Sequence, residues 1–258
     1  MSPATSPAID VRGLDVFRSG EPIIKKASFI IDNGEYVGLV GPNGGGKTTL
    51  LLSILGMIPG SGSIKLFGKP LQEFNDWKRV AYVSQSAINF DSTFPLTVKE
   101  MVSLGLVSRE RILKRLSKDD WRKVEETMKF MGIADLQGKR IGEISGGQKQ
   151  RMFVAKALVR EPDLLILDEP VAGVDASTLE RFYQKLSDLN SQKETTIVMV
   201  SHDLAAVFCR MSKVICVNRD VHYSAIDGSE VPQALLKKAY GEHFHFVFHQ
   251  HQCKGDFS

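Results

Sequence analysis

The run GPNGGGKT at residues 41–48 constrains the fold of this chain more than any other stretch. It has the spacing G-x-x-x-x-G-K-[ST], in which backbone N–H groups can close around phosphate oxygens. The apolar run Tyr36–Val40 precedes it, and a helical run at 48–55 follows it. The order of strand, loop and helix predicts an α/β fold that binds an anion where the helix begins.

The residue types of this loop suit a nucleoside triphosphate and its magnesium ion. Glycines permit positive φ angles and a close approach of the backbone to the ligand. Lys47 supplies a full charge to the β and γ phosphates, and Thr48 offers a hydroxyl to Mg²⁺. A glycine-rich turn that matches by chance is the alternative, but the flanking strand and helix favour nucleotide binding.

A second element lies in EPDLLILDEPVAGVD at residues 161–175. Its continuous apolar run, Leu164–Leu167, is typical of a parallel strand buried on both faces. Asp168 and Glu169 follow at the edge where open α/β sheets bind ligands. We expect Asp168 to assist Mg²⁺ and Glu169 to polarise the attacking water. The alternative is an acidic pair that caps the next helix.

A third apolar run, in TTIVMVSHD at residues 195–203, ends in Ser201, His202 and Asp203. At the same edge of the sheet, His202 is placed to contact the γ-phosphate and to sense its presence. A surface histidine or a helix cap is the plainer interpretation of such a residue.

The segment GEISGGQKQRMFVAKALVREP at 142–162 predicts a helix with Ser145 as its N-cap. Gly146 and Gly147 then leave bare backbone at a second anion-binding helix end. One nucleotide hardly needs two such ends, so a two-fold dimer is the economical arrangement, with this end over the partner's nucleotide. An ordinary capped helix is the alternative, and it leaves two glycines in a first turn unexplained.

These segments, in this order, resemble the motifs of the ATP-binding cassette (ABC) ATPases over about residues 9–228. The phosphate loop of that family is similar to GPNGGGKT, its signature to ISGGQ, its hydrolysis strand to LLILDEP and its D-loop to AGVD. Its switch histidine matches His202, its Q-loop glutamine Gln85 in YVSQS, and its adenine platform Phe17 in LDVFRSG. Ile144, Val171 and Phe17 depart from the commoner residues without removing a catalytic group, so we expect an active ATPase.

The resemblance implies the residues of a complete ATP site. Catalytic roles fall on Glu169, His202, Lys47 and Gln85, and Mg²⁺ ligation on Thr48, Gln85 and Asp168. ATP contacts fall on the platform and phosphate loop of one protomer and the signature of its twin, namely Phe17, Gly41, Pro42, Asn43, Gly44, Gly45, Gly46, Lys47, Thr48, Thr49, Ser145, Gly146, Gly147 and Gln148.

The resemblance also implies the fold, a P-loop NTPase of the ABC type. The nucleotide-binding domain is expected at 8–228, with a mostly parallel core sheet, an antiparallel β subdomain and a helical subdomain at about 86–150. Thr97 and Ser117 are predicted N-caps in the helical subdomain. Residues 229–258 are expected to form a C-terminal extension.

A helical subdomain of this kind is typical of family members that drive a membrane permease, where a groove beside Gln85 would receive a cytoplasmic helix. Phe90, Phe94 and Trp121 could line this groove, and the alternative is that they form the core of the subdomain. We therefore expect a homodimer at the cytoplasmic face of the inner or plasma membrane, peripheral because its apolar runs are too short to span a bilayer. A soluble ABC ATPase of DNA repair or translation is the alternative. The net charge of +3 gives no support to a nucleic-acid partner. A stand-alone P-loop kinase leaves ISGGQ unexplained.

Finer segments, among them NFDSTFPLTVKEMVSLGL and DEPVAGVD, look similar to the ATPases of bacterial zinc and manganese importers. That likeness implies uptake of zinc, manganese or iron, with an extracytoplasmic metal-binding protein as an indirect partner.

The tail GEHFHFVFHQHQCKGDFS has a composition of its own. As an extended strand it places one set of metal-binding side chains on one face, namely His243, His245, His249, His251 and Cys253. Imidazole and thiolate suit Zn²⁺ better than Mg²⁺, so the tail could sense zinc in the cytosol. A terminal strand that packs its phenylalanines on a neighbour is the alternative.

Overall fold

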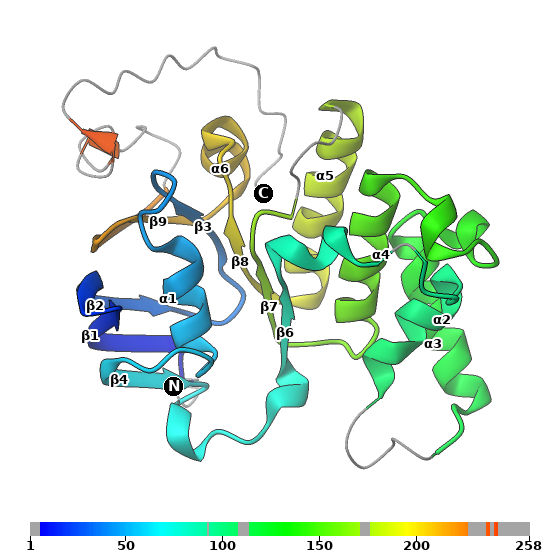
Figure 1. Cartoon of the computed structure of the whole chain (residues 1–258), viewed down its shortest axis with the longest axis horizontal. Coiled ribbons are helices and arrows are strands. Elements are labelled where there is room, and N and C mark those ends of the chain that lie inside the picture. Colours follow the sequence, from blue (N-terminus) through cyan, green and yellow to red (C-terminus); the bar gives the residue numbers. More distant parts are fainter. Residues whose placement is uncertain are drawn as a thin grey trace. The chain divides into compact units, whose positions relative to one another are not determined.

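The computed structural model describes residues 6–91, 93–107, 114–170, 176–226, 236–237 and 240–241 (Figure 1). The chain divides into two compact units, one of residues 1–75 with 190–258 and one of residues 76–189. Each unit is described by itself below, as unit 1 and unit 2.

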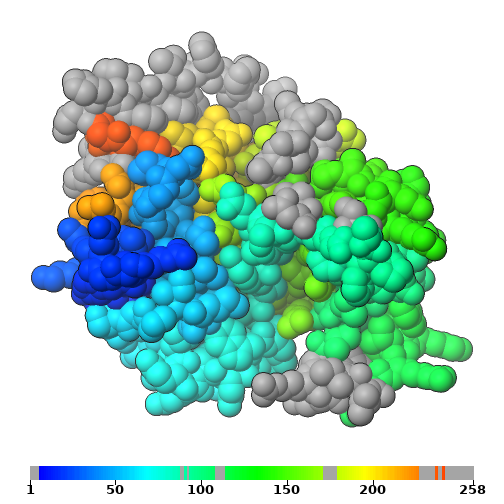
Figure 2. All heavy atoms as spheres, in the orientation of Figure 1, coloured from blue at the N-terminus to red at the C-terminus, as the bar shows by residue number. Residues whose placement is uncertain are grey.

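The first part of unit 1 is an antiparallel sheet. β1 (Ile9–Arg18) pairs with β2 (Glu21–Ile31) and with β4 (Ser61–Leu66), and β4 pairs with β5 (Lys69–Pro70). In the space-filling view, β1, β2 and α1 form one continuous surface (Figure 2). The predicted antiparallel β region is therefore present.

The core of unit 1 is parallel. β3 (Tyr36–Val40) lies between β8 (Thr196–Val200) and β9 (Lys213–Asn218), parallel to both, and β3 and β8 are buried throughout. β10 (Asp220–Ala225) runs antiparallel to β9 and reaches β2 through a single parallel pair. The strand order within unit 1 is β5-β4-β1-β2-β10-β9-β3-β8.

Unit 1 also contains the end of α5 (Ala176–Lys193), the helical residues 236, 237 and 240, two further helices and a short 3₁₀ turn. The two further helices and the turn are α1 (Lys47–Ile54), α6 (Leu204–Arg210) and η1 (Leu71–Glu73). α6 approaches β3 closely, since a Cβ atom on Gly38 would lie 2.6 Å from Val207 Cγ1. A glycine at this point lets the helix pack directly on the backbone of the strand.

Unit 2 contains a pair of parallel strands and the larger helices. β6 (Val80–Val83) pairs with β7 (Leu164–Leu167) residue by residue. The helices are α2 (Val98–Ser103), α3 (Lys118–Phe130), α4 (Gly146–Leu158) and α5 (Ala176–Lys193), the last belonging to unit 2 up to Leu189. Short 3₁₀ turns are η2 (Trp77–Arg79), η3 (Gln85–Asn89), η4 (Leu104–Leu106), η6 (Ala134–Leu136) and η7 (Ile141–Glu143).

The helix starts in unit 2 are where the sequence predicts them. Thr97 caps α2 and Ser117 caps α3, each in a capping box whose N3 carboxylate returns to the N-cap backbone. α3 buries Asp120, Val124 and Met128, and its other charged residues are exposed. These local signals, together with the mixed sheet, confirm the predicted α/β fold.

In the part of the chain that the structure describes, none of the helices has both the length and the apolar character that a bilayer span requires.

Candidate functional site

The loop at residues 41–46 joins β3 to α1 in unit 1. Gly46 is the N-cap of α1 with φ at 103°, a conformation that favours glycine, and it brings no side chain to cap the helix. Gly44 also has a positive φ, 76°. No side chain caps the first turn of α1, and a helix N-terminus of this kind can bind an anion through its backbone N–H groups.

Glycine is also required in this loop because the backbone of β9 lies against it. A Cβ atom would lie 2.0 Å from Val217 O at Gly41 and 2.7 Å from the same atom at Gly45. Real Cβ atoms do not approach a backbone oxygen this closely, so any side chain here would push the loop away from the sheet. The loop is held in place by close backbone packing.

Lys47 is the buried cation of this loop, with only 5% of the residue exposed. Its Nζ donates to Gly41 O at 2.9 Å and to Pro42 O at 3.0 Å, so the side chain folds back across the loop. The ammonium group lies beside the carbonyls that open the loop, and Thr48, the next residue, is exposed at the start of α1. A charge and a hydroxyl are thus placed at the same helix end.

His202 follows the neighbouring strand in unit 1. Leu39 of β3 pairs with Val200 of β8, so the phosphate loop and His202 leave the sheet at the same edge. Asp203, not His202, caps α6, since its carboxylate accepts the N–H of Ala206. His202 is exposed at this edge.

The acidic pair of unit 2 lies at the ends of β6 and β7. Asp168 is 1% exposed, and the hydroxyl of Tyr82 donates to its Oδ2 at 3.4 Å. Burial raises the pKa of Tyr82, and the negative charge of Asp168 raises it further, so the phenol stays neutral beside the carboxylate. The sequence analysis does not identify Tyr82, because VAYV is a continuous apolar run and no motif marks its tyrosine.

Glu169 and Gln85 meet directly. Gln85 Nε2 donates to Glu169 Oε2 at 2.7 Å, although the residues are 84 positions apart. Glu169 has φ at 48°, the left-handed region that non-glycine residues rarely adopt and that costs about 1–3 kcal/mol. Such strain is common at functional sites, where the fold holds a side chain in a required direction.

The signature segment of unit 2 forms the start of α4, as predicted. Ser145 is the N-cap, its Oγ accepts the N–H of Gln148, and Gln148 Oε1 accepts the N–H of Ser145 at 2.9 Å. Ser145 and Gly146 are exposed. A Cβ atom on Gly146 would meet nothing within 4 Å, so its side is open to a ligand.

The remaining predicted residues fall in three places. Phe17 lies on β1 with 58% of its surface exposed, which suits a ring that stacks on a base. Asn43 is exposed and Thr49 is half-buried at the phosphate loop. The tail residues His243, His245, His249, His251 and Cys253 lie outside the described residues, and so do the D-loop residues at 172–175.

The predicted Mg²⁺ ligands are chemically consistent with that ion. Thr48 offers a hydroxyl, Asp168 a carboxylate and Gln85 an amide. Hard oxygen donors of this kind suit Mg²⁺, which keeps several waters beside one or two carboxylates.

The sequence profile of the ABC transporter family matches residues 24–172, more than half of the chain. The chain belongs to the ABC transporter family. Membership in this family makes the chain an ATPase and agrees with the parallel core sheet and the antiparallel β region of unit 1.

Individual ABC proteins are similar along most of their length. The zinc uptake system ATP-binding protein ZurA of Listeria innocua is 40% identical over 222 residues, which is 86% of this chain and 85% of that protein. The manganese transport system ATP-binding protein MntB of Halalkalibacterium halodurans is 35% identical, over 92% of this chain and 93% of that protein. The structure of cbiO1 from Clostridium perfringens, part of the ABC transporter complex cbiONQ, has a TM-score of 0.77 at 27% identity, over 90% and 94% of the two chains.

Proposed function

We propose that this chain is the ATP-hydrolysing subunit of an importer for a divalent transition metal, zinc first, then manganese or iron. The observation that supports this cargo is the 40% identity to a protein named for zinc uptake, over 86% of this chain. The 35% identity to a protein named for manganese transport supports the same class of cargo. The alternative role in DNA repair or translation gains no support from these relatives.

The ATP site is proposed to use the residues predicted from the sequence. Lys47 and the N–H groups of the phosphate loop bind the β and γ phosphates, and Phe17 stacks on the adenine. Thr48, Asp168 and Gln85 would hold Mg²⁺, which would supply positive charge to the phosphate oxygens.

Glu169 is proposed as the general base. It takes the proton of the water that attacks the γ-phosphorus. The bond from the γ-phosphorus to the β–γ bridging oxygen breaks, and ADP departs with the bridging oxygen. Gln85 holds the Glu169 carboxylate at 2.7 Å, so the Q-loop controls where the base points. His202 is proposed to contact the γ-phosphate and to stabilise the charge that develops on it.

Each nucleotide is proposed to be closed by the signature end of a second copy. The capping box of α4 uses the Ser145 and Gln148 side chains on each other's backbone, and the N–H groups of Gly146 and Gly147 remain at the helix end. That end combines exposed glycine backbone with the positive end of the helix dipole, which suits a partner's γ-phosphate.

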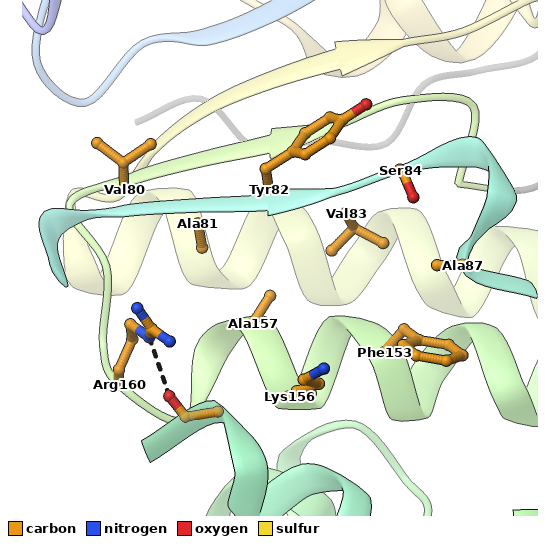
Figure 3. A pocket seen from close by; sticks show the side chains of 11 residues that line it. Val80, Ala81, Tyr82, Val83, Ser84, Ala87, Phe153, Lys156, Ala157 and Arg160 are labelled. Carbon is orange, nitrogen blue, oxygen red and sulfur yellow. Dashed lines mark hydrogen bonds between the residues drawn. The ribbon is translucent and has the colours of Figure 1, made fainter. Parts of the chain in front are cut away.

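A cavity of about 360 Å³ in unit 2 supports the proposed contact with a permease (Figure 3). It lies between β6 and α4, directly before the Q-loop, with Phe153 at one end. Lys156 and Arg160 both line it, and no carboxylate is among its lining residues, all of which the structure describes. The cavity therefore favours a cytoplasmic segment of the permease that carries an acidic side chain.

The positive charges that line this cavity also favour a partner with an acidic side chain. Burial lowers the pKa of Lys156, and the positive charge of Arg160 lowers it further, so an anionic partner would relieve an unfavourable pair. Phe90, predicted to line the permease groove, packs edge-on against Phe153 at 5.9 Å between ring centres. Trp121, also predicted to line the groove, lies near Lys99, whose Nζ is 5.3 Å from its ring centre.

The chain is accordingly proposed to act as a peripheral subunit at the cytoplasmic face, with an extracytoplasmic metal-binding protein reached through the permease. We propose a cassette at 8–228 with its helical subdomain at about 86–150, and a C-terminal extension at 229–258. Zinc sensing by the extension rests on the tail sequence alone. If it is right, a chain truncated after Tyr240 loses the Zn²⁺ binding of the full chain; equal affinity in both would exclude the tail.

The cargo is tested by the metal content of cells that lack the protein. Growth in metal-limited medium with zinc, manganese or iron restored in turn should show a deficit in one of these ions, corrected by the wild-type chain and not by the Glu169→Gln variant. A multi-span membrane protein should co-purify with the tagged chain. A normal content of all three metals, with no membrane protein captured, would refute the importer function.

A further inference from the structure

The C-terminal part of the chain reaches the phosphate loop through one side chain. The N–H of Gly41 donates to the hydroxyl of Tyr240 at 2.9 Å, across 199 positions of sequence. Tyr240 stands on a helical turn in which Gly241 N–H donates to Lys237 O at 2.8 Å. Leu236, four residues before Tyr240 and 1% exposed, anchors the same face of this turn.

Gly41 is a position where an external acceptor is needed. The last register pair between β3 and β9 is Val40 with Cys216, so Gly41 lies one residue beyond the ladder. The residue is buried, and a buried N–H group without an acceptor is costly. The backbone of Val217 excludes any side chain at Gly41, and the Tyr240 hydroxyl supplies the acceptor from another direction.

The other side of the same residue holds the catalytic lysine. The carbonyl of Gly41 accepts from Lys47 Nζ at 2.9 Å. Gly41 is therefore fixed at its N–H by Tyr240 and at its carbonyl by Lys47. A change in the orientation of Gly41 would move the carbonyl against which the ammonium group rests.

The surroundings keep Tyr240 in the form that this role needs. Burial raises the pKa of Tyr240, the bond from Gly41 N–H lowers it, and neighbouring Cys216 raises it. Burial also raises the pKa of the Cys216 thiol to about 12. A neutral phenol can accept the N–H group without placing a negative charge beside a loop that binds phosphates.

We infer that Tyr240 is a positioning residue for the phosphate loop, whose hydroxyl fixes the Gly41 peptide and so sets the affinity of the loop for nucleotide phosphates. The inference rests on the proposed function of residues 41–48 as the ATP site. It extends the nucleotide machinery beyond residue 228, into the segment that leads to the histidine-rich tail.

The test compares Tyr240→Phe with Tyr223→Phe in the full chain. Both changes remove one hydroxyl from unit 1, but Tyr223 lies on β10 and is 50% exposed. Tyr240→Phe should raise the Kd and KM for Mg-ATP about threefold to tenfold, the worth of one hydrogen bond, with kcat changed less than about twofold. Its affinity for adenosine, which has no phosphate, should equal that of the wild type, and Tyr223→Phe should match the wild type throughout.

Two results would overturn the inference: an unchanged Kd for Mg-ATP in Tyr240→Phe, or an equal loss for Mg-ATP and adenosine, which marks a general structural defect. If Tyr240→Phe does not fold, Leu236→Ala is tested in its place, because this change loosens the turn and keeps the Tyr240 hydroxyl. The same phosphate-specific loss of affinity is expected for Leu236→Ala. The absence of that loss would overturn the inference. Failure of the wild type itself to bind Mg-ATP would instead refute the proposed function.

Discussion

Glu169 shows how much one residue depends on its neighbours. It is half-buried, strained at φ 48°, and held by the amide of Gln85. The contact requires the end of β6 and the end of β7 to lie side by side, which the parallel register of the two strands provides. A base that is held by the Q-loop responds to whatever moves that loop, and the cavity beside the Q-loop is where a permease segment is proposed to bind.

Replacing Glu169 by Gln keeps the size of the side chain and removes the proton acceptor. ATP turnover should fall by about 10²–10⁴-fold, and the Kd for Mg-ATP should stay within about twofold of the wild type, because the phosphate loop is untouched. Steady-state phosphate release and equilibrium binding measure the two quantities. As a control, Glu143→Gln removes a carboxylate from η7 and should retain full turnover. Wild-type turnover in Glu169→Gln would show that another group is the base.

Gly45 tests the steric account of the phosphate loop. It has no positive φ, so a change to alanine probes the contact alone, and its new Cβ would lie 2.7 Å from Val217 O. Gly45→Ala should destabilise the protein by about 1–3 kcal/mol and weaken Mg-ATP binding, since either the loop or β9 must shift. Urea unfolding measures the first effect and nucleotide titration the second.

Gly138→Ala is the matched control for this prediction, because a Cβ there meets nothing within 4 Å and its φ is not positive. It should change the free energy of unfolding by less than about 0.5 kcal/mol. If Gly45→Ala is as neutral as the control, close packing on β9 is not what holds the loop.

At the scale of single elements, the end of α4 and the turn that follows it carry the charge of the cavity. Lys156 lies on α4 and Arg160 lies two residues beyond the last residue of the helix. The positive charge of Arg160 lowers the pKa of Lys156, so the pair is unfavourable unless an anion joins it. Arg160 also donates to Gly105 O at 3.0 Å, which ties the end of α4 to η4 (Figure 3).

Replacing Lys156 by an acidic residue should abolish binding to the permease and leave ATP hydrolysis by the isolated chain intact. In Lys156→Glu, association with the permease should be lost, and stimulation of ATPase activity by the permease should fall to less than about a tenth. ATP hydrolysis by the isolated chain should stay within about twofold of the wild type, because no ATP-site residue lines the cavity. Pull-down and ATPase assays with reconstituted permease measure these effects.

Lys129→Glu, an exposed change on α3, controls for the altered net charge. Normal permease binding by Lys156→Glu, in a protein whose melting temperature is preserved, would remove this cavity from the docking surface.

The sequence predicted individual elements better than the contacts between them. Leu164–Leu167 and the caps Thr97 and Ser117 follow from apolar runs and capping chemistry, which are local. The bond between Gln85 and Glu169 depends on strand order and register, and the bond between Gly41 and Tyr240 spans 199 positions. Local patterns do not encode such pairs, and Tyr240 matches no motif that would have marked it.

At the scale of the whole molecule, the predicted catalytic residues are divided between two compact units. Lys47 and His202 belong to unit 1, and Gln85, Asp168 and Glu169 belong to unit 2. The signature at Ser145 also belongs to unit 2, at an exposed helix end.

Dimerisation around ATP is the prediction that tests this account as a whole. In the Glu169→Gln background, Mg-ATP should convert the protein to a dimer, because both nucleotides persist between the two copies. Adding Gly146→Asp should keep it monomeric: the open side of Gly146 accepts the side chain without a clash, and the carboxylate then repels the partner's γ-phosphate. The helix itself should not lose stability, since an acidic residue is favourable at a helix N-terminus.

Gly138→Asp, also in open space, supplies the matched control and should dimerise normally. Light scattering on a sizing column with Mg-ATP separates the outcomes, and unfolding curves verify that Gly146→Asp is as stable as its parent. If Gly146→Asp is monomeric and Gly138→Asp is dimeric, electrostatic repulsion at the signature end explains the difference, because both proteins carry Glu169→Gln and keep the same fold and phosphate loop. A dimer that forms equally well with Gly146→Asp would mean that the signature helix does not face the partner's nucleotide, and the two glycines in its first turn would need another cause.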